Sequence, residues 1–171
     1  MIVFTYTIDE LINNVQIISM YRANAILQHS SQDVIIPLDD TAVTSEDNAI
    51  LLNYLKKGVS QIASVLSGYS TGLYDAEGIL YLPLEYIAAD EEVVPQVILR
   101  IAMPNTFNNT LAIPIDQAIQ DALEAYMLYR LFKSKGHNYE SYFDDYKLSI
   151  SNILAYINHR LTTTTRSMKL I

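Results

Sequence analysis

The sequence predicts a mainly α-helical fold, a four-helix bundle with a β-hairpin inserted between the second and third helices. Apolar residues recur every three or four positions in four segments, which is the repeat of one helical face. Between the second and third segments, near residues 78–103, the repeat changes to the two-residue alternation of strands. The 171 residues fit a single domain, which we place at residues 1–161, followed by a C-terminal tail at 162–171.

The first two helices are predicted from a capping signal followed by an apolar stripe. Thr7 and Glu10 have the spacing of a capping box, which places the start of the first helix near Thr7. Thr44, followed by acidic residues, is an N-cap for a second helix that runs to about Ser67, where Gly68 is suited to end it. The two expected stripes are Ile8, Leu11, Ile12, Val15, Ile18 and Tyr21, then Ile50, Leu51, Tyr54, Leu55, Val59, Ile62, Ala63 and Leu66.

The predicted hairpin consists of two alternating apolar sets, Leu80, Leu82, Leu84 and Tyr86, then Val97, Leu99, Ile101 and Met103. A two-stranded hairpin is marginally stable alone, so a helix, a third strand or another subunit must cover it. Residues 34–36 or residues 2–4 are apolar enough to provide that third strand. Alternatively, its exposed edge accepts a strand from a partner.

The third and fourth helices form a predicted hairpin of helices. Pro114 suits the first position of the third helix, Gly136 ends it, and Asn138 caps the fourth helix after a short turn. Short connections of this kind join antiparallel neighbours. Six of the thirteen tyrosines lie in residues 126–156. These rings either pack the core with their hydroxyls in water or form a subunit interface, where tyrosine is enriched.

Charge is distributed unevenly along the chain, whose formal net charge is −8. Residues 1–99 contain thirteen acidic and three basic residues, whereas residues 100–171 contain six acidic and eight basic residues. No Lys or Arg occurs in residues 58–99. Nucleic-acid binders concentrate basic residues to contact phosphates, so we expect no tight DNA or RNA binding. The acidic half serves either solubility or a surface that repels DNA.

The sequence also argues against several other classes of protein. There is no cysteine, so disulfides, thiolate metal sites and cysteine nucleophiles are excluded. No apolar run approaches the length of a membrane span, and the first residues lack the basic start of a signal peptide, so we expect synthesis in the cytoplasm and no membrane partner.

We find no motif for catalysis, a cofactor or a metal. His29, His137 and His159 lack metal-ligand spacing, and the adjacent acidic pairs are typical of solvated charge. The five glycines are scattered and form no phosphate-binding loop. We therefore expect a protein that is not an enzyme.

The pair of C-terminal helices resembles a known family. Residues 122–136, with Tyr126-Met-Leu-Tyr-Arg130, and residues 142–152 resemble the last two helices of tailed-bacteriophage head-to-tail adaptor proteins, also called connector, ring or neck proteins. The sequence departs from that pattern at Leu131, after the Tyr-Arg pair, and in having a glycine turn in place of an acidic one.

This resemblance implies a structural virion protein that forms a ring of identical subunits, commonly twelve, and bridges the portal to the tail. DNA passes through the lumen of such a ring. The implied partners are other copies of the chain, the portal protein and tail or further neck proteins. The implied location is the virion neck, after synthesis in the host bacterial cytoplasm. Candidate interface residues at the matching positions are Tyr126, Tyr129, Arg130, Tyr142 and Tyr146.

Two further sets of residues extend this hypothesis. Acidic residues of the base-poor segment would repel DNA from the channel wall, and the candidates are Asp75, Glu77, Glu85, Asp90, Glu91 and Glu92. The tail is either a frayed end or an arm that docks on a neighbouring subunit through Met168, Leu170 and Ile171. The alternative function is a small phage or bacterial helical protein-binding module or regulator, acting as a monomer or dimer through its β edge.

Overall fold

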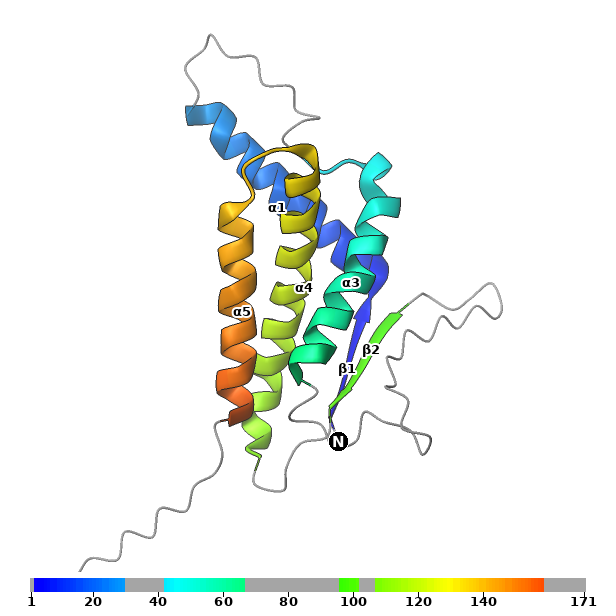
Figure 1. Ribbon diagram of the computed structural model, residues 1–171, viewed down its shortest axis with the longest axis vertical. Helices are drawn as coiled ribbons and strands as arrows, with labels where there is room; N and C mark the ends of the chain where they lie inside the picture. Colours follow the sequence, from blue (N-terminus) through cyan, green and yellow to red (C-terminus); the bar gives the residue numbers. More distant parts are fainter. Residues whose placement is uncertain (1, 30–41, 67–95, 102–106, 159–171) are drawn as a thin grey trace, which may run out of the picture.

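The protein is mainly helical, as expected, with a small antiparallel sheet (Figure 1). The computed structural model describes residues 2–29, 42–66, 96–101 and 107–158. These residues form four α-helices and two strands, which follow one another as β1 (Ile2–Thr7), α1 (Ile8–His29), α3 (Asn48–Leu66), β2 (Gln96–Ile101), α4 (Ala112–Lys135) and α5 (Glu140–Asn158). Short 3-10 turns at Ser45–Asp47 and Asn109–Leu111 lead into α3 and α4.

The sheet joins the start of the chain to the segment before α4. β1 and β2 pair antiparallel, with Phe4 opposite Leu99 and Tyr6 opposite Val97. Residues 2–4, one of the two candidates for the strand that covers the predicted hairpin, therefore lie in the strand that pairs with β2. The first half of that predicted hairpin, residues 80–86, lies outside the described residues, so the hairpin itself stays a prediction.

One face of the sheet is buried, because side chains alternate along a strand. Its buried residues are Phe4, Tyr6, Val97, Leu99 and Ile101. The predicted alternation of Val97, Leu99 and Ile101 is thus confirmed, while Met103 lies outside the described residues. On the opposite face Val3 is 49% exposed.

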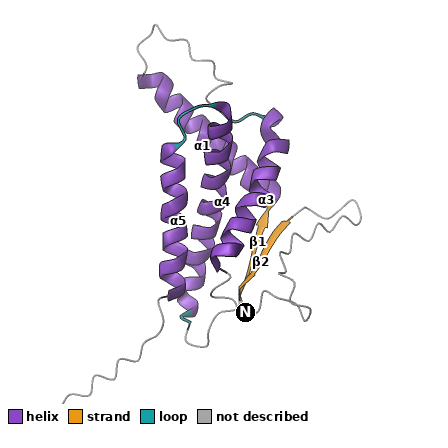
Figure 2. Ribbon diagram, viewed as in Figure 1, coloured by secondary structure: helices purple, strands orange, loops and turns teal. Residues whose placement is uncertain are grey.

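Helix α4 is the central element (Figure 2), since it contacts α1, α3, α5 and β1. α3, α4 and α5 stand side by side, and α1 crosses α4 (Figure 1). Ile115, Ile119, Leu123 and Met127, at intervals of four residues, are all 0% exposed. This spacing places them on one face of the helix, which forms the middle of the core.

The predicted stripes are largely confirmed, with two corrections. In α1 Leu11 and Val15 are buried, but Tyr21 is 74% exposed and Ala23 is buried. In α3 Ile50 is 46% exposed and Tyr54 is partly buried, whereas Leu51 and the other later stripe residues are buried. An α-helix turns about 100° per residue, so Tyr21 and Ile50 lie on the side of their helices away from the buried residues, and including them made the predicted stripes too wide.

The turn between α4 and α5 has the predicted glycine. Gly136 adopts φ 73°, the left-handed conformation in which glycine has no steric penalty. Its N–H donates to the Lys133 carbonyl at 3.3 Å, and the His137 N–H donates to the Phe132 carbonyl at 2.9 Å. These bonds satisfy carbonyls at the helix end and reverse the chain, so α5 returns along α4.

We predict that Gly58→Leu lowers the free energy of unfolding by about 1–3 kcal/mol, because it overpacks the contact between α3 and α4. A Cβ atom at Gly58 would already lie 3.1 Å from Cδ1 of Tyr126 and 3.5 Å from Cδ2 of Leu123. Urea denaturation measures the change. The matched control is Gln61→Leu at an exposed position of α3, which should shift stability by no more than about 0.5 kcal/mol. Equal stability of the two variants would contradict the assigned close packing.

Candidate functional site

The predicted interface residues of α4 and α5 divide into two groups. Tyr126, Tyr129 and Tyr146 form one aromatic cluster, with ring centroids 6.1 Å apart for Tyr126 and Tyr129 and 5.3 Å apart for Tyr126 and Tyr146. Tyr142 lies elsewhere, stacked on Phe132 at 5.2 Å. Tyr126 and Tyr142 are 8% and 5% exposed, so both rings pack within the subunit. Tyr129 and Tyr146 are partly exposed and remain available to a partner.

A surface of alternating rings and cations extends from this cluster over α3, α4 and α5. We call it the aromatic–basic face, and its members are the rings of Tyr54, Tyr129, Tyr139 and Phe143 with the cations of Lys57, Arg130, Lys133 and Lys147. Every cation lies within the roughly 6 Å at which a ring face attracts positive charge. The face includes the predicted Tyr129 and Arg130.

Rings and cations on this face hold one another in place. Lys147 Nζ lies 4.0 Å from the Phe143 ring centroid, and Lys133 Nζ lies 5.3 Å from the Tyr129 ring. Lys133 Nζ also donates to the Tyr129 hydroxyl at 3.1 Å, and this hydrogen bond raises the pKa of Lys133. Lys133 is therefore fully cationic at neutral pH.

Carboxylates gather along a different part of the molecule. We call them the acidic edge, which consists of Asp9, Glu10, Asp116, Asp121 and Glu124, from the first turn of α1 and the first half of α4. Four of the five are exposed, and Glu124 is buried at 7% exposure. Asp116 Oδ1 accepts a 2.7 Å hydrogen bond from the Tyr6 hydroxyl, which ties β1 to α4.

Glu124 is the least solvated carboxylate of this edge. Its Oε1 accepts hydrogen bonds from Asn14 Nδ2 and Gln120 Nε2, both at 2.9 Å. Burial raises the pKa of Glu124; the two hydrogen bonds oppose the rise, and the charges of Asp121 and Glu10 add to it. A carboxylate with these neighbours is one whose ionised form is destabilised by the fold.

A groove of about 300 Å³ lies between α1, α4 and α5, and Glu124 lines it. Arg22 lines the same groove and forms a 2.7 Å ion pair with Asp145. The Arg22 guanidinium also covers the Tyr142 ring at 4.1 Å. Arg22 thus joins α1 to α5, and the groove is a seam between helices whose walls combine charged residues with apolar ones such as Ile18 and Leu128.

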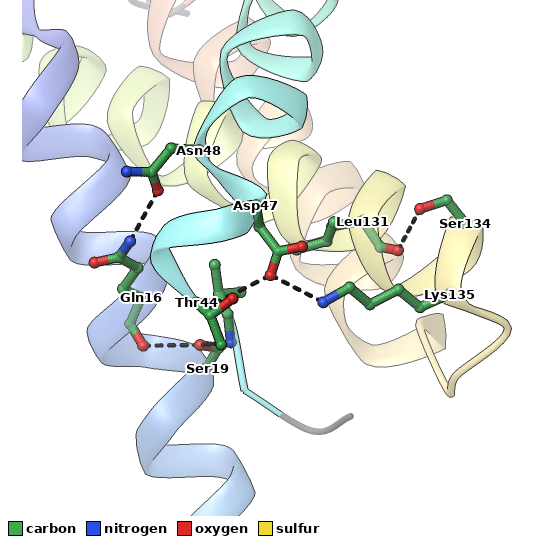
Figure 3. Close-up of polar contacts among 9 residues, drawn as sticks. Gln16, Ser19, Thr44, Asp47, Asn48, Leu131, Ser134 and Lys135 are labelled. Atoms are coloured by element: carbon green, nitrogen blue, oxygen red, sulfur yellow. Dashed lines mark hydrogen bonds and ion pairs between the residues drawn. The ribbon is translucent and has the colours of Figure 1, made fainter. Parts of the chain in front are cut away.

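A second polar junction joins α1, the start of α3 and the end of α4 (Figure 3). Lys135 Nζ lies 2.9 Å from Asp47 Oδ2, and the same oxygen accepts the Thr44 backbone N–H at 3.1 Å. Ser19 of α1, which is 0% exposed, accepts the Val43 backbone N–H at 3.0 Å. Asp47 is 7% exposed, so its charge depends on these partners.

No metal or membrane site emerges in the part of the chain that the structure describes. Its His, Asp and Glu side chains form no group of three that could hold a metal ion. No described helix is long and apolar enough to cross a membrane. Of the three histidines considered above, His137 lies in the turn after α4, beside Phe132.

Several predicted residues lie outside the described residues and keep their status as predictions. They are the six acidic candidates for the lumen, Asp75, Glu77, Glu85, Asp90, Glu91 and Glu92, and the tail anchors Met168, Leu170 and Ile171.

Sequence reasoning found Arg130 but missed Lys57, Lys133 and Lys147 of the aromatic–basic face, and it missed the buried Glu124. Two of these lysines had a readable signal, because Lys133 follows Tyr129 by four positions and Lys147 follows Phe143 by four, the spacing of neighbours on a helix. Glu124 had no such signal, since only the crossing of α1 buries it.

Comparison of this chain with protein families, with curated proteins and with solved structures finds no match.

We predict that Glu124→Gln is more stable than the wild type at pH 7. The raised pKa of Glu124 means that the folded state binds this proton more tightly than the unfolded state. Its contribution to stability is therefore present below the ordinary glutamate pKa of 4.5 and is lost as the pH rises through the folded pKa. The amide keeps an oxygen for Asn14 and Gln120 without the charge.

Thermal or urea denaturation from pH 4 to pH 8 tests this prediction. The stability advantage of Glu124→Gln should shrink as the pH falls toward 4.5, so the low-pH measurement is the internal control. A variant that is less stable than the wild type at pH 7 would show that the ionised carboxylate stabilises the fold.

Proposed function

We propose that this protein is a structural virion protein that forms a ring between the portal and the tail of a tailed bacteriophage, with DNA passing through its lumen. The observation that carries the proposal is the hairpin of α4 and α5, which turns at Gly136 and places Tyr129, Arg130 and Tyr146 where a neighbour can reach them. The same segments carry the resemblance to head-to-tail adaptors.

The proposal includes a finer arrangement of the fold. The four helices form the bundle of an adaptor domain, residues 1–161, and residues 78–103 contribute a β-hairpin whose second strand contains β2. The antiparallel pairing of β1 with β2 supports this arrangement, because it gives such a hairpin the third strand that it needs.

The segment between α3 and β2 faces the lumen in this proposal. It contains Asp75, Glu77, Glu85, Asp90, Glu91 and Glu92, and residues 58–99 have no Lys or Arg. Like charge repels the phosphates of DNA, so an acidic channel wall lets the duplex slide without binding. The net charge of −8 supports the same conclusion.

The proposed partners are other copies of this chain, commonly twelve in such rings, together with the portal protein and further neck or tail proteins. The tail arm, with Met168, Leu170 and Ile171, docks on the neighbouring subunit. The protein acts by shape and contact, in the neck of the virion, after synthesis in the host cytoplasm. It has no catalytic, cofactor or metal-binding role in this proposal.

A second candidate function is a helical protein-binding module or regulator that works as a monomer or dimer. The observation that favours it is the sheet, in which β1 and β2 pair only with each other among the described residues. Each strand therefore has an edge that a partner strand could extend.

Oligomeric state separates the two functions. We expect the full-length protein, alone or mixed with the portal protein of the same phage, to form closed rings in native mass measurement and negative-stain imaging. A protein that stays monomeric or dimeric under both conditions contradicts the ring. In a reconstruction of the ring, residues 75–92 on the outer wall would overturn the lumen assignment alone.

The tail arm makes a separate prediction. Deleting residues 162–171 should weaken ring assembly by at least about tenfold, because the apolar anchors lose their buried contact. A matched full-length variant, Met168→Ser/Leu170→Ser/Ile171→Ser, should weaken it to a similar extent. Unchanged assembly of both variants, measured by sedimentation velocity, would show that the tail is a free end.

A further inference from the structure

Three of the four cations of the aromatic–basic face have no ion-pair partner among the described residues. Lys57, Arg130 and Lys133 have no carboxylate within ion-pair distance in the part of the chain that the structure describes. The fourth cation, Lys147, pairs with Asp144 at 3.2 Å at the surface. Two other cations are paired inside the subunit, Lys135 with Asp47 and Arg22 with Asp145.

The acidic edge is the counterpart of this surface. Asp9, Glu10, Asp116, Asp121 and Glu124 take part in no ion pair with any described residue. Asp121 and Glu10 lie close enough to Glu124 for their negative charges to raise its pKa. The edge therefore carries a concentrated negative potential.

The two surfaces lie on different sides of α4 and at different heights along it. Nine residues separate Glu124 from Lys133, and an α-helix advances about 100° per residue, which places the two side chains about 180° apart. Glu124 faces α1 through Asn14, whereas Lys133 lies beside Tyr139 and Tyr129. One copy therefore cannot bring its own two surfaces together.

The helix dipole explains only part of this separation. Acidic residues stabilise the first turn of a helix and basic residues the last turn, but the effect fades beyond those turns. Asp121 and Glu124 lie in the third and fourth turns of α4, and Lys57 and Lys147 lie in the interiors of α3 and α5. The positions of these residues suit a contact with another molecule better than they suit helix stability.

We propose that the aromatic–basic face of one copy docks on the acidic edge of the next copy. This inference rests on the proposed function, because it takes a second copy as the partner, and it assigns the two surfaces that meet. Different patches on the two sides make the contact heterologous, which generates a ring where the rotation closes. The rings supply apolar area at the centre, and tyrosine and arginine are the residue types that dominate such contacts.

A second copy fits the aromatic–basic face better than a nucleic acid does. Three cations that have no ion-pair partner among the described residues, set among partly exposed rings, make a small positive surface on a chain whose net charge is −8. Phosphate binding depends on many basic contacts, and the net charge repels DNA. The acidic edge of a neighbour offers four exposed carboxylates, Asp9, Glu10, Asp116 and Asp121, as partners for these cations.

Two charge-reversed variants test the docking. Lys57→Glu/Lys133→Glu alters the basic side, and Glu10→Lys/Asp121→Lys alters the acidic side; all four residues are exposed. We expect each variant alone to self-associate about tenfold more weakly than the wild type at low salt. An equimolar mixture should regain wild-type association, because each reversed surface then meets one of opposite sign. Glu46→Lys, an exposed reversal outside both surfaces, is the control.

Sedimentation velocity and native mass measurement read out this test, with circular dichroism to check folding. Where a charge-reversed variant fails to fold, a neutral double variant of the same surface replaces it, either Lys57→Gln/Lys133→Gln or Glu10→Gln/Asp121→Asn. Each neutral variant should still weaken association and reduce its salt dependence. Wild-type rings that these variants do not weaken would overturn the docking and leave the ring function standing. A wild type that remains monomeric alone and with the portal overturns both.

The same variants test whether the aromatic–basic face binds nucleic acid and not a second copy of the chain. Wild-type protein that binds a short DNA duplex, with binding lost in Lys57→Glu/Lys133→Glu, would assign the aromatic–basic face to nucleic acid and overturn the docking. We expect no binding of the duplex by either protein.

Discussion

The burial of α4 is the constraint on which the rest of the structure depends. Its apolar face is fully excluded from water, and three helices and β1 pack around it. Burying apolar area contributes about 25 cal/mol per Å², so this helix supplies much of the stability of the subunit. α3 can approach α4 closely because residue 58 is a glycine. A Cβ atom at this position would lie only 3.1 Å from Cδ1 of the Tyr126 ring. Tyr126 then fills the space between α3 and α5, where it contacts Tyr146.

Polar contacts fix the register of the other elements along α4. The Tyr6 hydroxyl bonds to Asp116 near its start, Asn14 bonds to Glu124 midway, and Asp47 pairs with Lys135 at its end. A buried polar group without a partner costs about 1–3 kcal/mol, so sliding α1, β1 or the start of α3 by one turn is penalised. Apolar packing is less selective, since many registers bury similar area. These contacts therefore select one arrangement among those that the core permits.

Helical periodicity and end signals predict most of this fold, because they depend on residues close in the sequence. The start of α1 after Thr7, the stop at Gly136 and the buried alternation of β2 are of this kind. Contacts between distant segments are harder to predict. Two candidates were open for the third strand, residues 2–4 and residues 34–36; the former lie in β1, which pairs with β2 and is tied to α4 by the Tyr6 hydroxyl, and the latter lie outside the described residues. The burial of Glu124 likewise depends on where α1 crosses, which no local pattern records.

Folding pairs some of the charges of the described residues and leaves others without an ion-pair partner among them. Asp47 with Lys135 and Arg22 with Asp145 join elements of one subunit. Exposed ion pairs contribute only about 0–1 kcal/mol, so folding gains little from pairing the remaining charges. The remaining charges matter more when two molecules associate, since complementary charged surfaces speed the approach of the partners and exclude wrong orientations. The net charge of −8 repels copies of this chain from one another, so the proposed docking must overcome that repulsion locally. A scaffold such as a portal, which holds copies at high effective concentration, would favour the ring over free subunits.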